Sequence, residues 1–274
     1  SITFGVNSQL ASIENDTFYK TALTSIAIPD TVTSIGYGAF KEATLLNSIT
    51  FGVNSQLASI ENDTFYKTAL TSIAIPDTVT SIGYGAFYKA TSLNSITFGA
   101  NSQLTSIGSY AFRNATALTS IAIPDTLTTI GDGAFYATSL NSITFGANSQ
   151  LNTIGSYAFK NATALTTIAI PDTVTTFGSS AFYETTSLNS ITFGANSQLN
   201  SIGDYAFRYA SALTTIAIPD TVTTIGTYAF YGTSNLISVT FGANSQLTII
   251  ERFAFYQASA LTSIAIPDLV TSIG

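Results

Sequence analysis

Aspartate recurs directly after proline, and this row of carboxylates is the first place where the sequence could support chemistry. Carboxylates in a row can bind cations, but successive members are 47 or 48 residues apart. This interval spans two repeating units of the chain, or about 10 Å by strand spacing. Neighbouring aspartates in the row therefore cannot share one ion. We therefore expect these side chains to cap turns. The row comprises Asp30, Asp77, Asp125, Asp172, Asp220 and Asp268.

Two other segments bring oxygen ligands close together, Glu14-Asn15-Asp16 and Glu61-Asn62-Asp63. Calcium takes about six to eight oxygen ligands, and no fuller ligand loop surrounds either segment, so we predict no metal site. Asn-X-Thr sequons also occur, but such matches arise easily in a chain rich in Asn and Thr. They begin at Asn15, Asn62, Asn114 and Asn161.

Composition excludes several classes of function. The chain has no His, Cys, Met or Trp, which removes Ser-His and Cys-His nucleophilic pairs and the usual zinc ligands. No acid and base in distinct environments can be paired, so we expect neither an enzyme nor a cofactor. A net charge of -7 with only 8 Lys and Arg argues against nucleic acid as a partner. No apolar run approaches the roughly 20 residues that span a bilayer.

An internal repeat determines how these residues are placed. A leucine opens each unit, and two kinds of unit alternate, so the full period is 47 or 48 residues. Pro coils contain Ile-Pro-Asp, whereas Gly coils contain Phe-Gly followed by Ala or Val and then Asn. The opening leucines are Leu23, Leu46, Leu70, Leu93, Leu118, Leu140, Leu165, Leu188, Leu213, Leu236 and Leu261, 22–25 residues apart.

The pattern within one coil predicts its structure. Apolar residues alternate in L-x-x-I-x-[IF], which predicts a strand with one buried face, and proline ends that strand. A second apolar pair, a glycine and an Ala-Phe pair supply the opposite wall. One coil buries too little apolar surface to offset its conformational entropy, so coils must stack.

We therefore predict a single right-handed repeat solenoid over residues 1–274. It should have about eleven coils, a parallel β-sheet on one face, short strands, turns and 3-10 segments on the other, and little or no α-helix. Both ends look truncated. Residues 1–40 recur unchanged at 48–87, and tolerance of copy number suits a multivalent surface or a spacer better than a catalytic site.

Two units, Leu70 to Phe87 (LTSIAIPDTVTSIGYGAF) and Leu118 to Phe135 (LTSIAIPDTLTTIGDGAF), resemble the BspA-like, or Treponema pallidum-type, leucine-rich repeats. The resemblance covers essentially the whole chain. It implies a leucine-rich-repeat solenoid, and it implies surface or secreted proteins linked to adhesion. The family often has Cys three residues after the Phe, where this chain has small residues such as Ala115 and Thr185. We interpret that place as a packing position.

Outward-facing columns on the predicted sheet are the candidate binding surface. One column holds Ser or Thr in every coil, and its neighbour alternates Ala with Thr. Such hydroxyls could contact a protein, a glycan or even ice, although Ala interrupts any ice-binding array. Alternatively they are ordinary solvent-facing residues, which the lack of bulky hot-spot residues favours. The candidates are Ser95, Thr97, Ser120, Ser142, Thr144, Thr167, Ser190, Thr192 and Thr215.

Tyrosines gather around the Ala-Phe pair on the far wall, as at Tyr88, Tyr110, Tyr136 and Tyr157. They could form an aromatic ridge for sugars or for another solenoid. We favour the alternative, in which each ring covers its neighbour and only the hydroxyl is wet.

These observations point to a non-catalytic binding module, extracellular or at the cell surface. It should adhere to an extracellular protein or glycan through repeated weak contacts. A structural spacer or self-associating scaffold is the alternative, because the repeats are nearly uniform.

Overall fold

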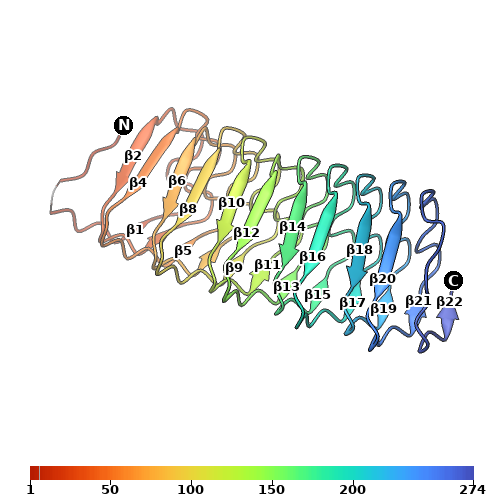
Figure 1. Ribbon diagram of the computed structural model, residues 1–274. Coiled ribbons are helices and arrows are strands. Elements are labelled where there is room, and N and C mark those ends of the chain that lie inside the picture. Colours follow the sequence, from red (N-terminus) through yellow and green to blue (C-terminus); the bar gives the residue numbers. More distant parts are fainter. Residues whose placement is uncertain (6) are drawn as a thin grey trace.

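The computed structural model describes residues 1–5 and 7–274 and shows a stack of eleven coils (Figure 1). Long strands lie side by side along one face, and the described residues contain no helix. The long strands are β2 (Ser25–Ile28), β4 (Ser48–Phe51), β6 (Ser72–Ile75), β8 (Ser95–Phe98), β10 (Ser120–Ile123), β12 (Ser142–Phe145), β14 (Thr167–Ile170), β16 (Ser190–Phe193), β18 (Thr215–Ile218) and β20 (Ser238–Phe241).

The long strands form separate parallel pairs, each joining a Pro coil to the Gly coil that follows it. Within a pair the register is direct, as in Ser120↔Ser142 and Ala122↔Thr144. Between pairs the strands diverge. The amide of Asn94 reaches the carbonyl of Thr71 at 2.9 Å inside a pair, but Thr71 reaches Asn47 of the preceding pair only at 3.4 Å. The pairs are β2–β4, β6–β8, β10–β12, β14–β16 and β18–β20.

Continuity comes instead from the second, shorter strand of each coil. From β5 to β22 these two-residue strands form one ten-stranded parallel sheet. The predicted parallel-stranded solenoid is confirmed, with the long strands on its one face divided into pairs. The short strands are β1 (Ser12–Ile13), β3 (Ser34–Ile35), β5 (Ser59–Ile60), β7 (Ser81–Ile82), β9 (Ser106–Ile107), β11 (Thr129–Ile130), β13 (Thr153–Ile154), β15 (Thr176–Phe177), β17 (Ser201–Ile202), β19 (Thr224–Ile225), β21 (Ile249–Ile250) and β22 (Ser272–Ile273).

A ladder of stacked phenylalanine rings runs along the core. Successive ring centroids are 5.1–5.6 Å apart and the planes differ by 2–22°. Nine of the rings are completely buried, and offset stacking at this distance is favourable. These core phenylalanines are Phe18, Phe40, Phe65, Phe87, Phe112, Phe135, Phe159, Phe182, Phe207, Phe230 and Phe255.

The far wall is a run of turns around each core phenylalanine. In every coil the residues two before and two after that phenylalanine are left-handed, with φ of 53–70°. Hydrogen bonds alternate accordingly. The amide of Ala39 closes a turn onto Gly36 at 3.2 Å, while the next amide, that of Phe40, reaches Thr64 of the following coil at 3.0 Å. The turns therefore have 3-10-type bonds without forming a continuous 3-10 helix in the described residues.

Small residues fill the place three positions after the core phenylalanine. Ala115 and Thr185 are completely buried there. The threonines satisfy their hydroxyls by donating to the phenylalanine carbonyl, at 2.7 Å for Thr185 and 2.9 Å for Thr138. The position therefore serves packing, as the sequence indicated.

Candidate functional surfaces

The nine predicted sheet-face residues all lie outside the core, but on four different strand pairs. Three serines are half-buried, and the other six residues are exposed. Side chains along each of these strands alternate between the outer face and the core. The intervening isoleucine is therefore buried, at 3% exposure for Ile121 and 5% for Ile143. The half-buried residues are Ser95, Ser142 and Ser190, and the exposed ones are Thr97, Ser120, Thr144, Thr167, Thr192 and Thr215.

A cleft opens at the edge of the sheet where one strand pair meets the next. Between β4 and β6 it measures about 230 Å³ and is lined by residues including Phe51, Gly52 and Pro76. The same lining recurs three double repeats later, where Phe193 and Pro219 border a cleft of about 320 Å³. The strand-ending phenylalanines of the Gly coils are only half-buried for this reason.

The aspartates that follow proline do not cap turns with their side chains. The turn is closed by backbone, as from the Val32 amide to the Pro29 carbonyl at 3.1 Å. Oδ1 of Asp125 is buried and has no hydrogen-bond partner, and it occupies the space that Gly146 leaves open in the next coil. The expectation of side-chain capping is therefore wrong for this row. The same arrangement holds for Asp30, Asp172 and Asp220.

The oxygen-rich segments have a structural role instead. Oδ1 of Asn15 accepts a hydrogen bond from the Tyr37 amide at 2.8 Å, and Oδ1 of Asn62 accepts one from the Tyr84 amide at 2.7 Å. Each asparagine thus links its coil to the next. Among the described residues no three carboxylates gather closely enough to hold a metal ion. Two of the sequon asparagines are already engaged by these bonds.

On the far wall between Phe87 and Tyr231, the residue after the core phenylalanine is tyrosine in Pro coils and Arg or Lys in Gly coils. Rings and cations therefore alternate along the stack of coils. The guanidinium of Arg113 lies 5.3 Å from the Tyr88 ring and 4.7 Å from the Tyr136 ring. Lys160 and Arg208 are held in the same way. We call this run the Tyr–cation column: Tyr88, Arg113, Tyr136, Lys160, Tyr183, Arg208 and Tyr231.

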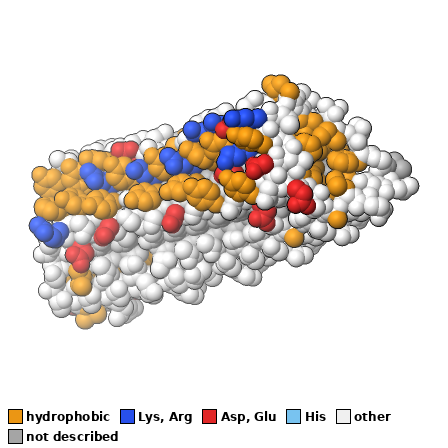
Figure 2. All heavy atoms as spheres, turned by 180° about the vertical axis from the view of Figure 1, so that it is seen from behind, with side chains coloured by type: hydrophobic (Ala, Val, Ile, Leu, Met, Phe, Trp, Pro, Cys, Tyr) orange, Lys and Arg blue, Asp and Glu red, His pale blue; other side chains and the backbone are white. Residues whose placement is uncertain are grey.

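A second set of tyrosines flanks the cations from the side. Tyr110 lies 5.2 Å from Arg113, and Tyr205 lies 5.5 Å from Arg208. Burial raises the pKa of the Tyr183 phenol, and the hydrogen bond from Arg208 lowers the pKa of Tyr209. Figure 2 shows the result as apolar rows interleaved with basic side chains along the back of the solenoid. The predicted covering of ring by neighbouring ring is thus wrong within the Tyr–cation column, because a cation separates its rings. It is confirmed beside the column, where Tyr205 stacks on Tyr228 with centroids 5.3 Å apart.

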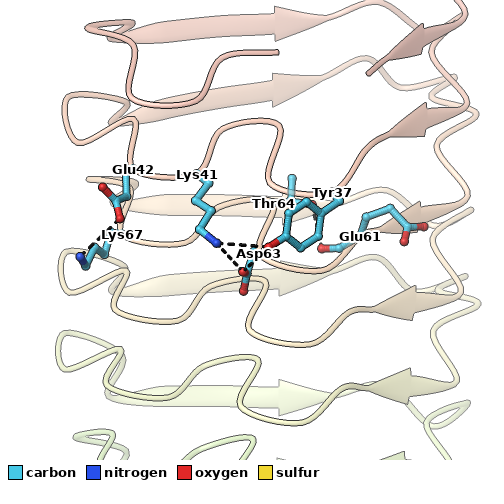
Figure 3. Close-up of polar contacts among 7 residues, drawn as sticks. All are labelled: Tyr37, Lys41, Glu42, Glu61, Asp63, Thr64 and Lys67. Atoms are coloured by element: carbon cyan, nitrogen blue, oxygen red, sulfur yellow. Dashed lines mark hydrogen bonds and ion pairs between the residues drawn. The ribbon is translucent and has the colours of Figure 1, made fainter. Parts of the chain in front are cut away.

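Near the N-terminus, ion pairs accompany the stacking of cations on rings. Nζ of Lys41 lies 2.8 Å from Oδ2 of Asp63, and the Tyr37 hydroxyl donates to the same carboxylate at 3.3 Å (Figure 3). The hydrogen bond to Asp63 raises the pKa of Lys41. Oε1 of Glu42 lies 3.6 Å from Nζ of Lys67 in the next coil. These cations are already neutralised by carboxylates.

Sequence reasoning missed both the clefts and the alternation of rings with cations. Signals for both were present. The Gly coil is two residues longer than the Pro coil between its first two leucines, for example from Leu93 to Leu104 against Leu118 to Leu127, which separates the strand pairs. Between Phe87 and Tyr231 the alternation is visible as Phe-Tyr in Pro coils and Phe-Arg or Phe-Lys in Gly coils, but its meaning depends on knowing that these positions stack.

The family profile described as BspA type Leucine rich repeat region matches residues 11–103, 98–200 and 194–274, in six copies. The chain belongs to the BspA-type leucine-rich repeat family. The stack of coils above is therefore a BspA-type leucine-rich repeat array, as the resemblance implied. No curated protein sequence matches the chain.

Solved structures agree with this assignment of the BspA-type array. A leucine-rich repeat protein from Eubacterium ventriosum is 27% identical, with a TM-score of 0.60 over 97% of this chain and 78% of that one. The pneumococcal vaccine antigen PcpA is 22% identical, with a TM-score of 0.57 over 96% of this chain and 79% of that one, and supports the fold alone. Across the described part of the chain, no helix long and apolar enough to cross a bilayer is present.

Proposed function

We propose that this chain is a non-catalytic binding module that holds an extracellular macromolecule by many weak contacts along its sheet face. The observation that carries the proposal is the uniform presentation of that face. Five strand pairs in the same register each direct a threonine outward at the same position. A ligand that engages one pair can engage the next, and linked weak contacts add up to useful avidity.

The clefts between strand pairs support the same proposal. Each offers an apolar ring and a proline beside the exposed threonine column, a small recess of the kind that accepts a partner side chain. The resemblance to surface and secreted repeat proteins leads us to place the module outside the cell or on its surface. We assign it no catalytic residue and no cofactor.

Replacing three exposed sheet threonines with glutamate should weaken binding by this face. The variant Thr97→Glu, Thr144→Glu, Thr192→Glu places a bulky charge on three strand pairs, and the desolvation and steric costs should weaken binding at least about tenfold. Binding of the whole chain to immobilised extracellular-matrix proteins and neutral glycans at physiological salt measures this. Unchanged binding by the variant would contradict the assignment to the sheet face.

The matched control carries the same charges on exposed turn threonines outside the strands, as Thr116→Glu, Thr163→Glu, Thr186→Glu. It should bind within about twofold of the unmodified chain, because these residues lie outside both the sheet and the clefts. Circular dichroism confirms that both variants keep the fold.

A spacer or self-associating scaffold is the second candidate, favoured by the identity of residues 1–40 with 48–87. A scaffold of this kind should show a molecular mass that rises with concentration. Light scattering over a hundredfold range of concentration tests this, and a constant monomer mass would remove self-association from consideration.

A further inference from the structure

All eight Lys and Arg side chains of this acidic chain lie against aromatic rings, at 4.5–5.8 Å from ring centroids. Three of them pair with carboxylates near the N-terminus. Within the residues that the structure describes, no carboxylate lies in ion-pairing distance of Lys89, Arg113, Lys160 or Arg208. The back of the solenoid therefore carries unneutralised positive charge, although the chain as a whole is negative (Figure 2).

The rings hold these cations in fixed places. Nε of Arg113 is buried between tyrosines without an acceptor, and the terminal nitrogens of the same guanidinium neither are buried unsatisfied nor bond to protein in the described structure. They are therefore open to solvent and free to donate. Lys160 is braced by Tyr136 at 5.7 Å and by Tyr183 at 4.5 Å. Such bracing lowers the entropy that each cation loses when it binds an anion.

The spacing of the cations restricts the ligand. Arg113, Lys160 and Arg208 are 47 and 48 residues apart, which is two coils, or about 10 Å by strand spacing. Each ring between them has a cation over it on either side, so it offers the ligand its edge and its hydroxyl. The column thus presents a charge, then a phenolic hydroxyl, then a charge again.

We propose that the Tyr–cation column binds a linear acidic polysaccharide in which acidic and neutral sugars alternate. An extended disaccharide is comparable in length to two coils, so one carboxylate can meet each cation while the neutral sugar hydroxyls meet the tyrosine between. Nucleic acid fits less well, because it carries a phosphate about every 3.4 Å along each strand. A net charge of -7 also repels such dense polyanions. This site is independent of the sheet face.

Binding of hyaluronan oligosaccharides to the whole chain tests the proposal. We expect saturable binding that weakens with added salt and that is stronger for an octasaccharide, which spans the three cations, than for a tetrasaccharide. Carboxyl-reduced hyaluronan should not bind. No binding of the octasaccharide at low salt, or equal binding of the carboxyl-reduced polymer, would overturn the proposal.

Charge-removing variants test the site. Arg113→Met, Lys160→Met, Arg208→Met keeps an unbranched side chain between the rings and should weaken octasaccharide binding about tenfold or more, since three ion pairs are lost. The control Lys20→Met, Lys67→Met, Arg252→Met removes the same charge elsewhere and should change binding less than threefold. Equal losses in both variants would show a diffuse charge effect and overturn the site.

Two further variants separate binding from folding. Arg113→Lys, Arg208→Lys keeps the charges and should retain binding within about threefold even if the melting temperature falls. Glu184 lies close enough to raise the pKa of Tyr183, and Glu184→Gln should strengthen binding because it removes a negative charge beside the column.

Concentration-dependent dimers that the triple methionine variant abolishes, without oligosaccharide binding by the unmodified chain, would instead identify a second copy as the occupant. The sheet-face variant Thr97→Glu, Thr144→Glu, Thr192→Glu should bind the octasaccharide normally, so failure of one proposal leaves the other intact.

Discussion

Phe135→Ala is expected to lower the free energy of unfolding by about 3–5 kcal/mol, the usual cost of removing a large buried ring. The ring is completely buried, and its centroid lies 5.3 Å from that of Phe112 and 5.4 Å from that of Phe159. Its loss leaves a cavity in the middle of the ladder, which the hydrogen-bonded coils on either side cannot collapse to fill. Urea denaturation followed by circular dichroism measures the change.

The same substitution should also divide the unfolding transition. Coils contact only their neighbours, so a weak interface in the middle of the stack lets the two halves unfold separately. We expect a lower m-value or two resolved steps in place of one cooperative step. Leu45→Ala serves as control because Leu45 is 54% exposed, and it should cost less than about 0.5 kcal/mol. A Phe135→Ala protein within about 1 kcal/mol of the unmodified chain would contradict the importance of the ladder.

Deleting a single coil is expected to be far more damaging than deleting two. Removal of residues 118–139 places one Gly coil directly on another, so β12 loses its partner β10 and Arg113 faces Lys160 without Tyr136 between them. Two partly desolvated like charges and one lost strand pair should cost about 3 kcal/mol or more. For a chain of this size that loss lowers Tm by about 6–12 °C.

Removal of residues 118–164 is the matched control. It takes out one Pro coil and one Gly coil, so a Gly coil is again followed by a Pro coil and Arg113 meets Tyr183. The chain loses only the stability that the two deleted coils contribute through contacts with their neighbours. Tm should therefore fall by less than about 3 °C. Thermal melts of the two deletion variants compare their Tm values. Equal Tm values would mean that the single coil, and not the double coil, is the unit of stability.

The alternation of coil types explains several features at once. A Pro coil followed by a Gly coil gives a strand pair, an aspartate seated over a glycine, and a tyrosine stacked on a cation. At the C-terminal end a tyrosine stacks on a tyrosine instead, with the centroids of Tyr231 and Tyr256 5.5 Å apart. Another departure lies at Tyr66 and Tyr88, which are neighbours in the stack with centroids 5.2 Å apart. It falls where the second copy of the duplicated segment ends and Tyr88 replaces Lys41. There the following coil supplies Tyr110 and Arg113 in place of Asp63 and Tyr66, so the stacking partners change together.

By itself, the sequence determined the repeat, the number of coils, the parallel strands and the buried phenylalanines. These features depend on local periodicity and on the need to bury apolar side chains, and both can be read along the chain. The outward direction of Thr97 and Thr144 was predictable for the same reason, because residues alternate across a strand. The family assignment also came from the linear pattern Ile-Pro through Ala-Phe.

Only the tertiary structure decided which residues meet between coils. Whether β4 pairs with β6, whether Asp125 caps a turn or sits over Gly146, and whether Arg113 lies between Tyr88 and Tyr136 all depend on the register of residues 22–25 positions apart. A difference of two residues in one turn changes that register for a whole coil. Local patterns alone do not specify this stacking, because it is set by the balance of backbone hydrogen bonds and packing across the interface of neighbouring coils.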